Sequence, residues 1–141
     1  MKCDIIMSMS SVFTKIIQGE IPCYKIYEDE KTLAFLDISP EAVGHTLVVP
    51  KIEVEKLYEL PDEDYQALMM TVKKLMAHYE KVLGKRMTLK VVGVDVPHTH
   101  VHILPFDEYF QAELKEGISE ATKPKLSEDN LKELQQKLRL D

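Results

Sequence analysis

The spacing of apolar residues along the chain predicts several short strands and three helices. Apolar residues recur at helical spacing from Val12 to Ile17, and Gly19 and Pro22 end that segment. Further along, runs of β-branched, aromatic and other apolar residues are bounded by polar, glycine or proline positions, as strands usually are. These runs predict five strands, at residues 24–27, 32–36, 45–49, 87–92 and 98–104.

A long helix is predicted between the third and fourth strands. Asp62 is the expected N-cap, and apolar residues then keep a three-and-four spacing until Gly84, which supplies a C-terminal stop. Ser127 is the expected N-cap of a last helix that carries leucines on one face. The pattern therefore predicts an α+β fold: a mainly antiparallel five-stranded sheet with one long helix, a short N-terminal helix and a C-terminal helix.

The length of 141 residues fits a single domain with one core. We expect residues 1–10 to form a flexible leader and residues 11–105 to form the domain itself. Residues 106–141 would then be a C-terminal extension that ends in a helix, packed on the same domain or on a partner subunit.

The composition narrows the classes of function and of location. The formal net charge of -6 opposes binding to nucleic acid, because such binders normally present a concentrated basic face. Cys3 and Cys23 lack the spacing of a disulfide framework or a CxxC zinc site, so a reducing, cytoplasmic location fits best. No stretch approaches the ~20 apolar residues of a membrane span. We therefore expect neither nucleic acid nor a membrane as a partner.

Three histidines, His98, His100 and His102, occupy alternate positions of the predicted fifth strand. Residues two apart in a strand point to the same face, so the imidazoles would form a row with neighbours about 7 Å apart. Neighbouring histidines are unfavourable when they are buried without partners, and protonated neighbours repel one another. Such a row therefore indicates a function.

Three interpretations of this row are open. It can be the solvated polar face of an edge strand, although such positions usually hold Thr, Lys or Glu. It can be a metal site that takes two of these imidazoles and His45 as ligands. It can also perform phosphoryl-group chemistry, because neutral imidazole is a nucleophile near pH 7 and a neighbouring histidine can donate a hydrogen bond to the leaving group.

The segment His98-Thr99-His100-Val101-His102-Ile103-Leu104 resembles the signature of the histidine triad (HIT) family, with Thr99 at a position that is usually apolar. Similarity to the Hint-like nucleotide hydrolase and transferase branch of that family continues upstream, through residues 13–17, 19–22, 34–40 and 44–50. The resemblance spans about residues 12–105 in the family's usual order, and it implies a HIT-like fold for this part of the chain.

The resemblance implies a nucleotide-binding enzyme in which His100 becomes covalently nucleotidylated, with His98 and His102 as its partners at the phosphate. Asp37 matches the acidic residue that holds the ribose hydroxyls. The other residues that match the nucleotide site are Phe13, Ile16, Ile21, Phe35, Ile38, Leu47 and His45. The apolar ones fit a core equally well, and a buried hydrogen-bonded role for His45 is as well supported as a catalytic one. Family members are commonly homodimers, so the resemblance also implies a homodimer.

Two departures from the family pattern bear on the chemistry. Relatives often bind structural zinc through cysteines near the start of the chain, where this sequence has Ser11 and Thr14, so no metal and no other cofactor are expected. Relatives also bind phosphate through a Gly-Gln-Ser/Thr stretch before the triad, where this chain has the shorter segment 92–97. Within it, Asp95 would repel a phosphate if its carboxylate pointed inward.

The function that we expect is hydrolysis or transfer at the α-phosphate of nucleoside phosphoramidates or related nucleotide conjugates, through a nucleotidyl-histidine intermediate. The expected substrate is a conjugate of a purine nucleoside monophosphate. One alternative is a dinucleoside polyphosphate hydrolase with the same nucleophile. Another is a nucleotide-binding regulatory protein with weak or no catalysis.

Overall fold

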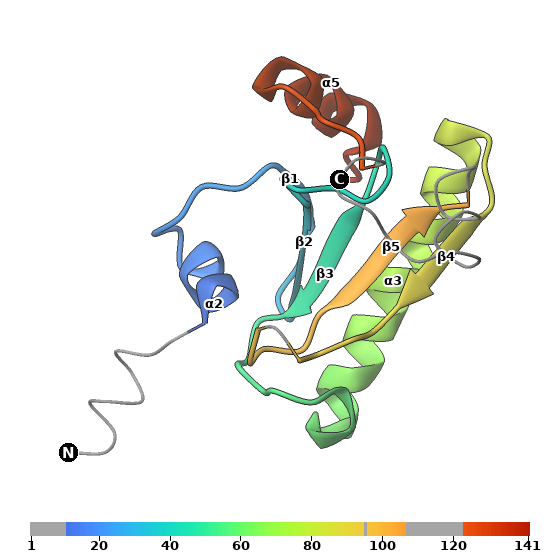
Figure 1. Cartoon of the computed structure of the whole chain (residues 1–141). Helices are drawn as coiled ribbons and strands as arrows, with labels where there is room; N and C mark the ends of the chain where they lie inside the picture. Colours follow the sequence, from blue (N-terminus) through green and yellow to red (C-terminus); the bar gives the residue numbers. More distant parts are fainter. Residues whose placement is uncertain (1–10, 95, 107–122) are drawn as a thin grey trace.

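The computed structural model describes residues 11–94, 96–106 and 123–141. The predicted leader, residues 1–10, lies outside the described residues, as do Asp95 and residues 107–122 of the predicted extension. The short helix α2 and the long helix α3 lie on opposite sides of the sheet, and helix α5 lies near the end of the sheet where β1 begins (Figure 1). The fold therefore has three layers, helix, sheet and helix.

Five antiparallel strands form the sheet, in the order β1-β2-β3-β5-β4. Their bounds are Lys25–Glu28 (β1), Thr32–Leu36 (β2), Thr46–Pro50 (β3), Met87–Lys90 (β4) and Val101–Pro105 (β5). The strands β2 and β3 are buried along their whole length, because both of their faces are covered. The predicted α+β fold with five antiparallel strands is confirmed.

The start of the predicted strand 98–104 is wrong, because β5 begins only at Val101. The carbonyl of Pro50, at the end of β3, accepts a hydrogen bond from the ring of His98 at 2.8 Å. Thr99 donates from its backbone N–H and its Oγ1 to the carbonyl of Val54, at 2.7 Å each. Because these bonds replace ladder bonds, the histidine signature begins in a loop and only ends in a strand.

Helix α3, Asp62–Leu83, packs against one face of the sheet. A stripe of buried residues at helical spacing faces the strands, and it consists of Leu68, Val72, Leu75 and Tyr79. The helix ends as predicted at Gly84, whose φ of 67° is left-handed. The predicted N-cap is wrong by one residue, because Pro61 is the cap and Asp62 opens the first turn, where its carboxylate meets the positive end of the helix dipole.

Helix α2, Val12–Ile17, is the short helix that the apolar spacing predicts, and it covers the opposite face. Its N-cap is Ser11, whose Oγ accepts a hydrogen bond from the N–H of Thr14 at 3.1 Å. Phe13 packs edge-on against Phe35 of β2, with 5.8 Å between the ring centroids. Together with Leu33, Leu47 and Val49 these rings form a second, smaller core under α2. This core lies beside the histidines described below.

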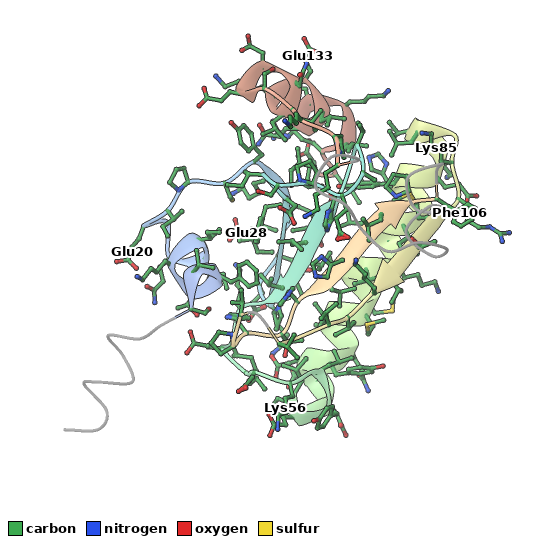
Figure 2. All side chains as sticks on the ribbon, in the orientation of Figure 1. Glu20, Glu28, Lys56, Lys85, Phe106 and Glu133 are labelled. Atoms are coloured by element: carbon green, nitrogen blue, oxygen red, sulfur yellow. The ribbon has the colours of Figure 1, made fainter. Side chains whose placement is uncertain are left out.

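Helix α5, Glu128–Leu138, closes the described chain. Ser127 caps it as predicted, and Asn130 completes a capping box. Leu131 and Leu138 are buried in the main core with α3, while Glu133 points away from the sheet (Figure 2). After the helix, the N–H of Leu140 donates to the carbonyl of Ile26 at 3.0 Å, so the end of the chain covers the outer edge of β1.

A short 3-10 helix, η1 (Leu57–Glu59), links β3 to α3. None of the helices in the described segments combines the length and the apolar character needed to cross a membrane.

Candidate active site

The three histidines of the triad lie together on the α2 side of the sheet. His98 and His100 are buried in the loop ahead of β5, whereas His102 is half-buried within β5. Ring centroids are 6.0 Å apart between Phe13 and His98, and 5.0 Å apart between Phe13 and His100. His100 and His102 are also separated by 5.0 Å. The structure thus brings the predicted imidazoles together, although only His102 belongs to the strand.

Both ring nitrogens of His98 are held by the protein. Nε2 donates to the carbonyl of Pro50, so Nδ1 carries the lone pair and accepts from Oγ of Ser11 at 3.0 Å. Thr14 Oγ1 lies 3.3 Å from the same nitrogen and donates to Glu53. Burial lowers the pKa of His98 below its usual value. His98 is therefore a neutral, fixed ring whose nitrogens face the protein.

His98 positions His100 through its backbone. Nδ1 of His100 donates to the carbonyl of His98 at 2.7 Å. A neutral imidazole has one proton, so this bond leaves the lone pair on Nε2 of His100. A lone pair on a ring nitrogen is what a nucleophile requires.

His102 is held in the complementary tautomer by a chain of hydrogen bonds. The N–H of Glu41 donates to Nδ1 of His45 at 3.0 Å, and Nε2 of His45 lies 2.9 Å from Nδ1 of His102. His45 thus carries its proton on Nε2 and donates it to His102, which carries its own proton on Nε2. Burial, with the positive charges nearby, lowers the pKa of His45 to about 3, so this ring is neutral near pH 7. We call this chain the Glu41–His45–His102 relay.

Asp37 lies at the end of β2 next to the relay. Its Oδ2 is 3.6 Å from Nε2 of His45, and its Oδ1 accepts from the N–H of Ser39 at 2.8 Å. Burial raises the pKa of Asp37, while the positive charge of Lys123 acts in the opposite direction. The carboxylate that the sequence assigns to the ribose thus lies in reach of the histidines.

The predicted apolar residues of the nucleotide site fall into two groups. Phe13, Phe35 and Leu47 are buried in the core under α2, so they pack beside the site. The more accessible ones are Ile16 and Ile21, which line a hollow of about 340 Å³. Ile38 is 70% exposed and lines a different hollow with residues 123–126. The structure therefore does not place Ile38 with the other predicted base contacts.

A third hollow, of about 360 Å³, opens beside His100. It lies between residues 55–58 and the segment 91–94, and most of its lining is apolar. Gly93 allows the chain to turn there, with a left-handed φ of 74°. The buried nucleophile candidate therefore has an opening next to it.

Asp37, His45 and His102 also present ligand atoms within 4.8 Å of one another, a spacing that a metal ion can bridge. A ligating nitrogen must offer a lone pair, whereas Nε2 of neutral His45 carries the proton because Nδ1 accepts from Glu41. Both nitrogens of His98 are hydrogen-bonded within the protein and do not join this group. The described residues therefore fit a proton relay better than a metal ion.

Comparison with known proteins identifies relatives of this chain. The model of the HIT domain matches residues 18–109. An uncharacterized HIT-like protein of Methanocaldococcus jannaschii is 43% identical over 99 residues, which cover 67% of this chain and 77% of that protein. Adenosine 5'-monophosphoramidase of Schizosaccharomyces pombe is 39% identical over 103 residues, which cover 69% of this chain and 74% of the relative.

Among solved structures, a HIT-like protein of Bartonella henselae, described as involved in cell-cycle regulation, superposes with a TM-score of 0.76. It is 30% identical, and the match covers 92% of this chain and 93% of the other. The HIT domain spans more than half of the chain and includes all three histidines of the row. The chain therefore belongs to the HIT domain family.

Proposed function

We propose that the protein is a nucleotide hydrolase or nucleotidyl transferase that acts on the α-phosphate of nucleoside phosphoramidates or related conjugates. The observation that carries the proposal is the set of hydrogen bonds at Nδ1 of His100 and, through His45, at Nδ1 of His102. These bonds assign a lone pair to Nε2 of His100 and a proton to Nε2 of His102. The similarity to a relative named adenosine 5'-monophosphoramidase supports a purine nucleotide as the substrate.

The first step forms a bond between Nε2 of His100 and the α-phosphorus and breaks the bond from phosphorus to the leaving group. Nε2–H of His102 passes its proton to the departing nitrogen or oxygen, so the leaving group departs protonated. Asp37 accepts hydrogen bonds from the ribose hydroxyls. In this scheme His98 acts through its carbonyl, which holds the proton of His100 on Nδ1.

The second step transfers the nucleotidyl group to water. Water attacks the phosphorus and gives one proton back to Nε2 of His102, the bond to Nε2 of His100 breaks, and a nucleoside monophosphate leaves. The imidazole of His100 recovers its lone pair, so it can act again. Both steps use groups that the protein itself holds in position, which favours catalysis by preorganisation.

The test replaces the nucleophile. In His100→Ala, turnover of adenosine 5'-monophosphoramidate should fall by at least about a thousandfold, because the covalent route is lost. AMP binding should remain, and wild-type enzyme quenched without acid during turnover should carry an AMP adduct on His100 by mass spectrometry.

The matched control is His78→Gln. His78 lies on α3, away from the row, and its Nε2 donates to the carbonyl of Leu138 at 3.1 Å. This variant should keep turnover. Full turnover in His100→Ala would refute the nucleophile, faster turnover of dinucleoside polyphosphates would favour that substrate class, and AMP binding without any turnover would favour a regulatory protein.

The homodimer, the cytoplasmic location and the division at residues 11–105 belong to the same proposal. The strand β4 ends the strand order and leaves one edge unpaired within the described sheet. Leu89, Val91 and Val92, on and after this strand, are 38–52% exposed, which supports an interface with a second copy.

A further inference from the structure

A lysine–glutamate ion pair lies beside the histidines. Lys90 is the last residue of β4, and its Nζ is 2.6 Å and 2.9 Å from the two carboxylate oxygens of Glu41. The Lys90 side chain is 26% exposed and that of Glu41 only 12%. The pair is thus largely withdrawn from solvent.

The register of the sheet places Lys90 on the histidine face. Lys90 is directly opposite His102 in the antiparallel pair of β4 and β5, and opposite residues project to the same face. His102 in turn lies opposite Leu47, which belongs to the core under α2. The side chain of Lys90 therefore projects from the same face of the sheet as the histidines.

The same pair is joined to the relay. Glu41 binds Lys90 with its carboxylate and donates its backbone N–H to His45. The positive charges of Lys90 and Lys123 both help to lower the pKa of His45, so the charge of Lys90 acts on the imidazoles. The carboxylate of Glu41 opposes this charge at longer range, so a phosphate between His100 and His102 would gain most from direct contact with the ammonium.

Stability alone does not account for such a pair. A partly buried ion pair loses hydration, and replacing it by apolar residues is often neutral for stability. An ammonium has three N–H donors, so a lysine can keep a carboxylate partner and also donate to a phosphate oxygen. Because Glu41 already holds the long side chain of Lys90 in place, less side-chain entropy is lost when Lys90 binds a phosphate.

We propose that Lys90, oriented by Glu41, binds a non-bridging oxygen of the substrate's phosphate and makes the site select charged nucleotides over neutral nucleosides. This inference rests on the proposed nucleotide function and extends it with a residue that determines specificity. It predicts an effect on phosphate-bearing ligands alone, because a nucleoside presents no charge to the ammonium.

The experiment compares AMP and adenosine in titration calorimetry at fixed ionic strength. In Lys90→Met, the affinity for AMP should fall about ten- to a hundredfold, as expected for loss of a charge-assisted hydrogen bond. The affinity for adenosine should stay within about twofold. Lys90→Arg keeps the charge and should retain most of the AMP affinity.

Lys51→Met is the matched control. Lys51 pairs with Glu28 at 2.9 Å, with side chains 28% and 34% exposed, but at the β1 side of the sheet. This variant should change neither affinity. Because Lys90→Met leaves Glu41 without its cation, the double variant Lys90→Met/Glu41→Gln repeats the test without an unpaired carboxylate.

The outcomes separate the two proposals. Unchanged AMP affinity in Lys90→Met and in the double variant, or equal losses for AMP and adenosine, would overturn the role of Lys90 while the nucleotide function stands. A wild-type protein that binds no AMP would overturn the nucleotide function and this inference together. A selective loss for AMP supports both.

Discussion

His45 keeps the relay in one protonation state only while its own ring is neutral. The backbone N–H of Glu41 points at Nδ1, so a second proton on that nitrogen would face a donor. Burial adds to this effect, and the pKa falls from the ordinary value of 6.5 to about 3. The fold therefore fixes the tautomer of His102, but the neutral ring of His45 makes the folded protein less stable at low pH.

The sign of the resulting pH dependence follows from linkage. Between pH 6.5 and about 3 the unfolded chain binds a proton at His45 that the folded chain does not, so the contribution of His45 to stability is present above pH 6.5 and is lost as pH falls. From pH 7 to pH 5 this loss is about 2 kcal/mol. In His45→Gln the decrease in unfolding free energy over this interval should be smaller by that amount.

Urea denaturation at each pH measures the difference. Above pH 7 the stability curves of His45→Gln and wild type should run parallel, because His45 is neutral in both states there. Equal decreases from pH 7 to pH 5 in the two proteins would show that the folded ring is protonated as easily as the unfolded one. Other groups, such as His98, contribute to both curves alike.

The histidines and Asp37 of the candidate site were named from sequence, but Glu41 and Lys90 beside them were not. Alternate spacing and the family resemblance point to His100, and the structure gives it the tautomer of a nucleophile. Glu41 and Lys90 are 49 positions apart in the chain, so nothing local indicates that they pair. One local feature of the sequence indicates that Lys90 lies near the triad, namely its place in the strand that precedes the triad.

Helix α2 depends on one serine for two purposes. Oγ of Ser11 caps the helix by accepting from Thr14, and it also donates to Nδ1 of His98. Ser11 is 5% exposed, and its N–H donates to Glu53 at 2.8 Å. The helix terminus and the loop that carries the histidines are therefore linked by the same hydroxyl.

Ser11→Ala should reduce both stability and catalysis. Loss of the cap and of a buried hydrogen bond should lower the unfolding free energy by about 1–3 kcal/mol. Because Nδ1 of His98 then loses the hydroxyl that donates to it, kcat should fall while KM for the nucleotide changes less. Chemical denaturation and steady-state kinetics on one preparation give both values.

Ser127→Ala separates the two effects. Ser127 also caps its helix, α5, by accepting from a backbone N–H, but it lies on the exposed surface. Its removal should lower stability by about 1 kcal/mol and leave kcat unchanged. A Ser11→Ala variant that loses stability but keeps full kcat would show that the serine is only a cap.

The predicted elements agree with the structure where local periodicity decides, and fail where side chains bind the backbone. The stripe on α3, the cap at Ser127 and the strand Thr32–Leu36 follow from spacing and capping chemistry. The start of β5 could not be predicted in this way. His98 and Thr99 have the alternation of a strand, but they bond to Pro50 and Val54 from a loop.

For the molecule as a whole, the sequence predicted the sheet and the family but not the strand order that brings the residues of the site together. The order β1-β2-β3-β5-β4 places β5, which holds His102, between β3, which follows His45, and β4, which ends at Lys90. Such non-local neighbours depend on tertiary packing, which periodicity does not encode. The contacts within the site therefore follow from the assembled sheet.

The same order leaves β4 at the edge, with exposed apolar residues along it. An unpaired strand with an apolar face favours association with another strand. We expect the wild-type protein to be a homodimer by size-exclusion chromatography with light scattering. Leu89→Lys places a charge at this edge and should raise the dimer Kd by at least about tenfold, which corresponds to 1.4 kcal/mol.

Val43→Lys is the matched control for the dimer, because Val43 and Leu89 have the same exposed fraction, 43%. Val43 lies in a hollow with residue 126 and residues of α5, and no residue of β4 lines that hollow, so this variant should remain dimeric. A monomeric wild-type protein, or equal dissociation of both variants, would contradict an interface at β4. His98, His100 and His102 lie in one chain. A monomeric Leu89→Lys variant that still binds AMP would therefore show that each subunit holds a complete nucleotide site.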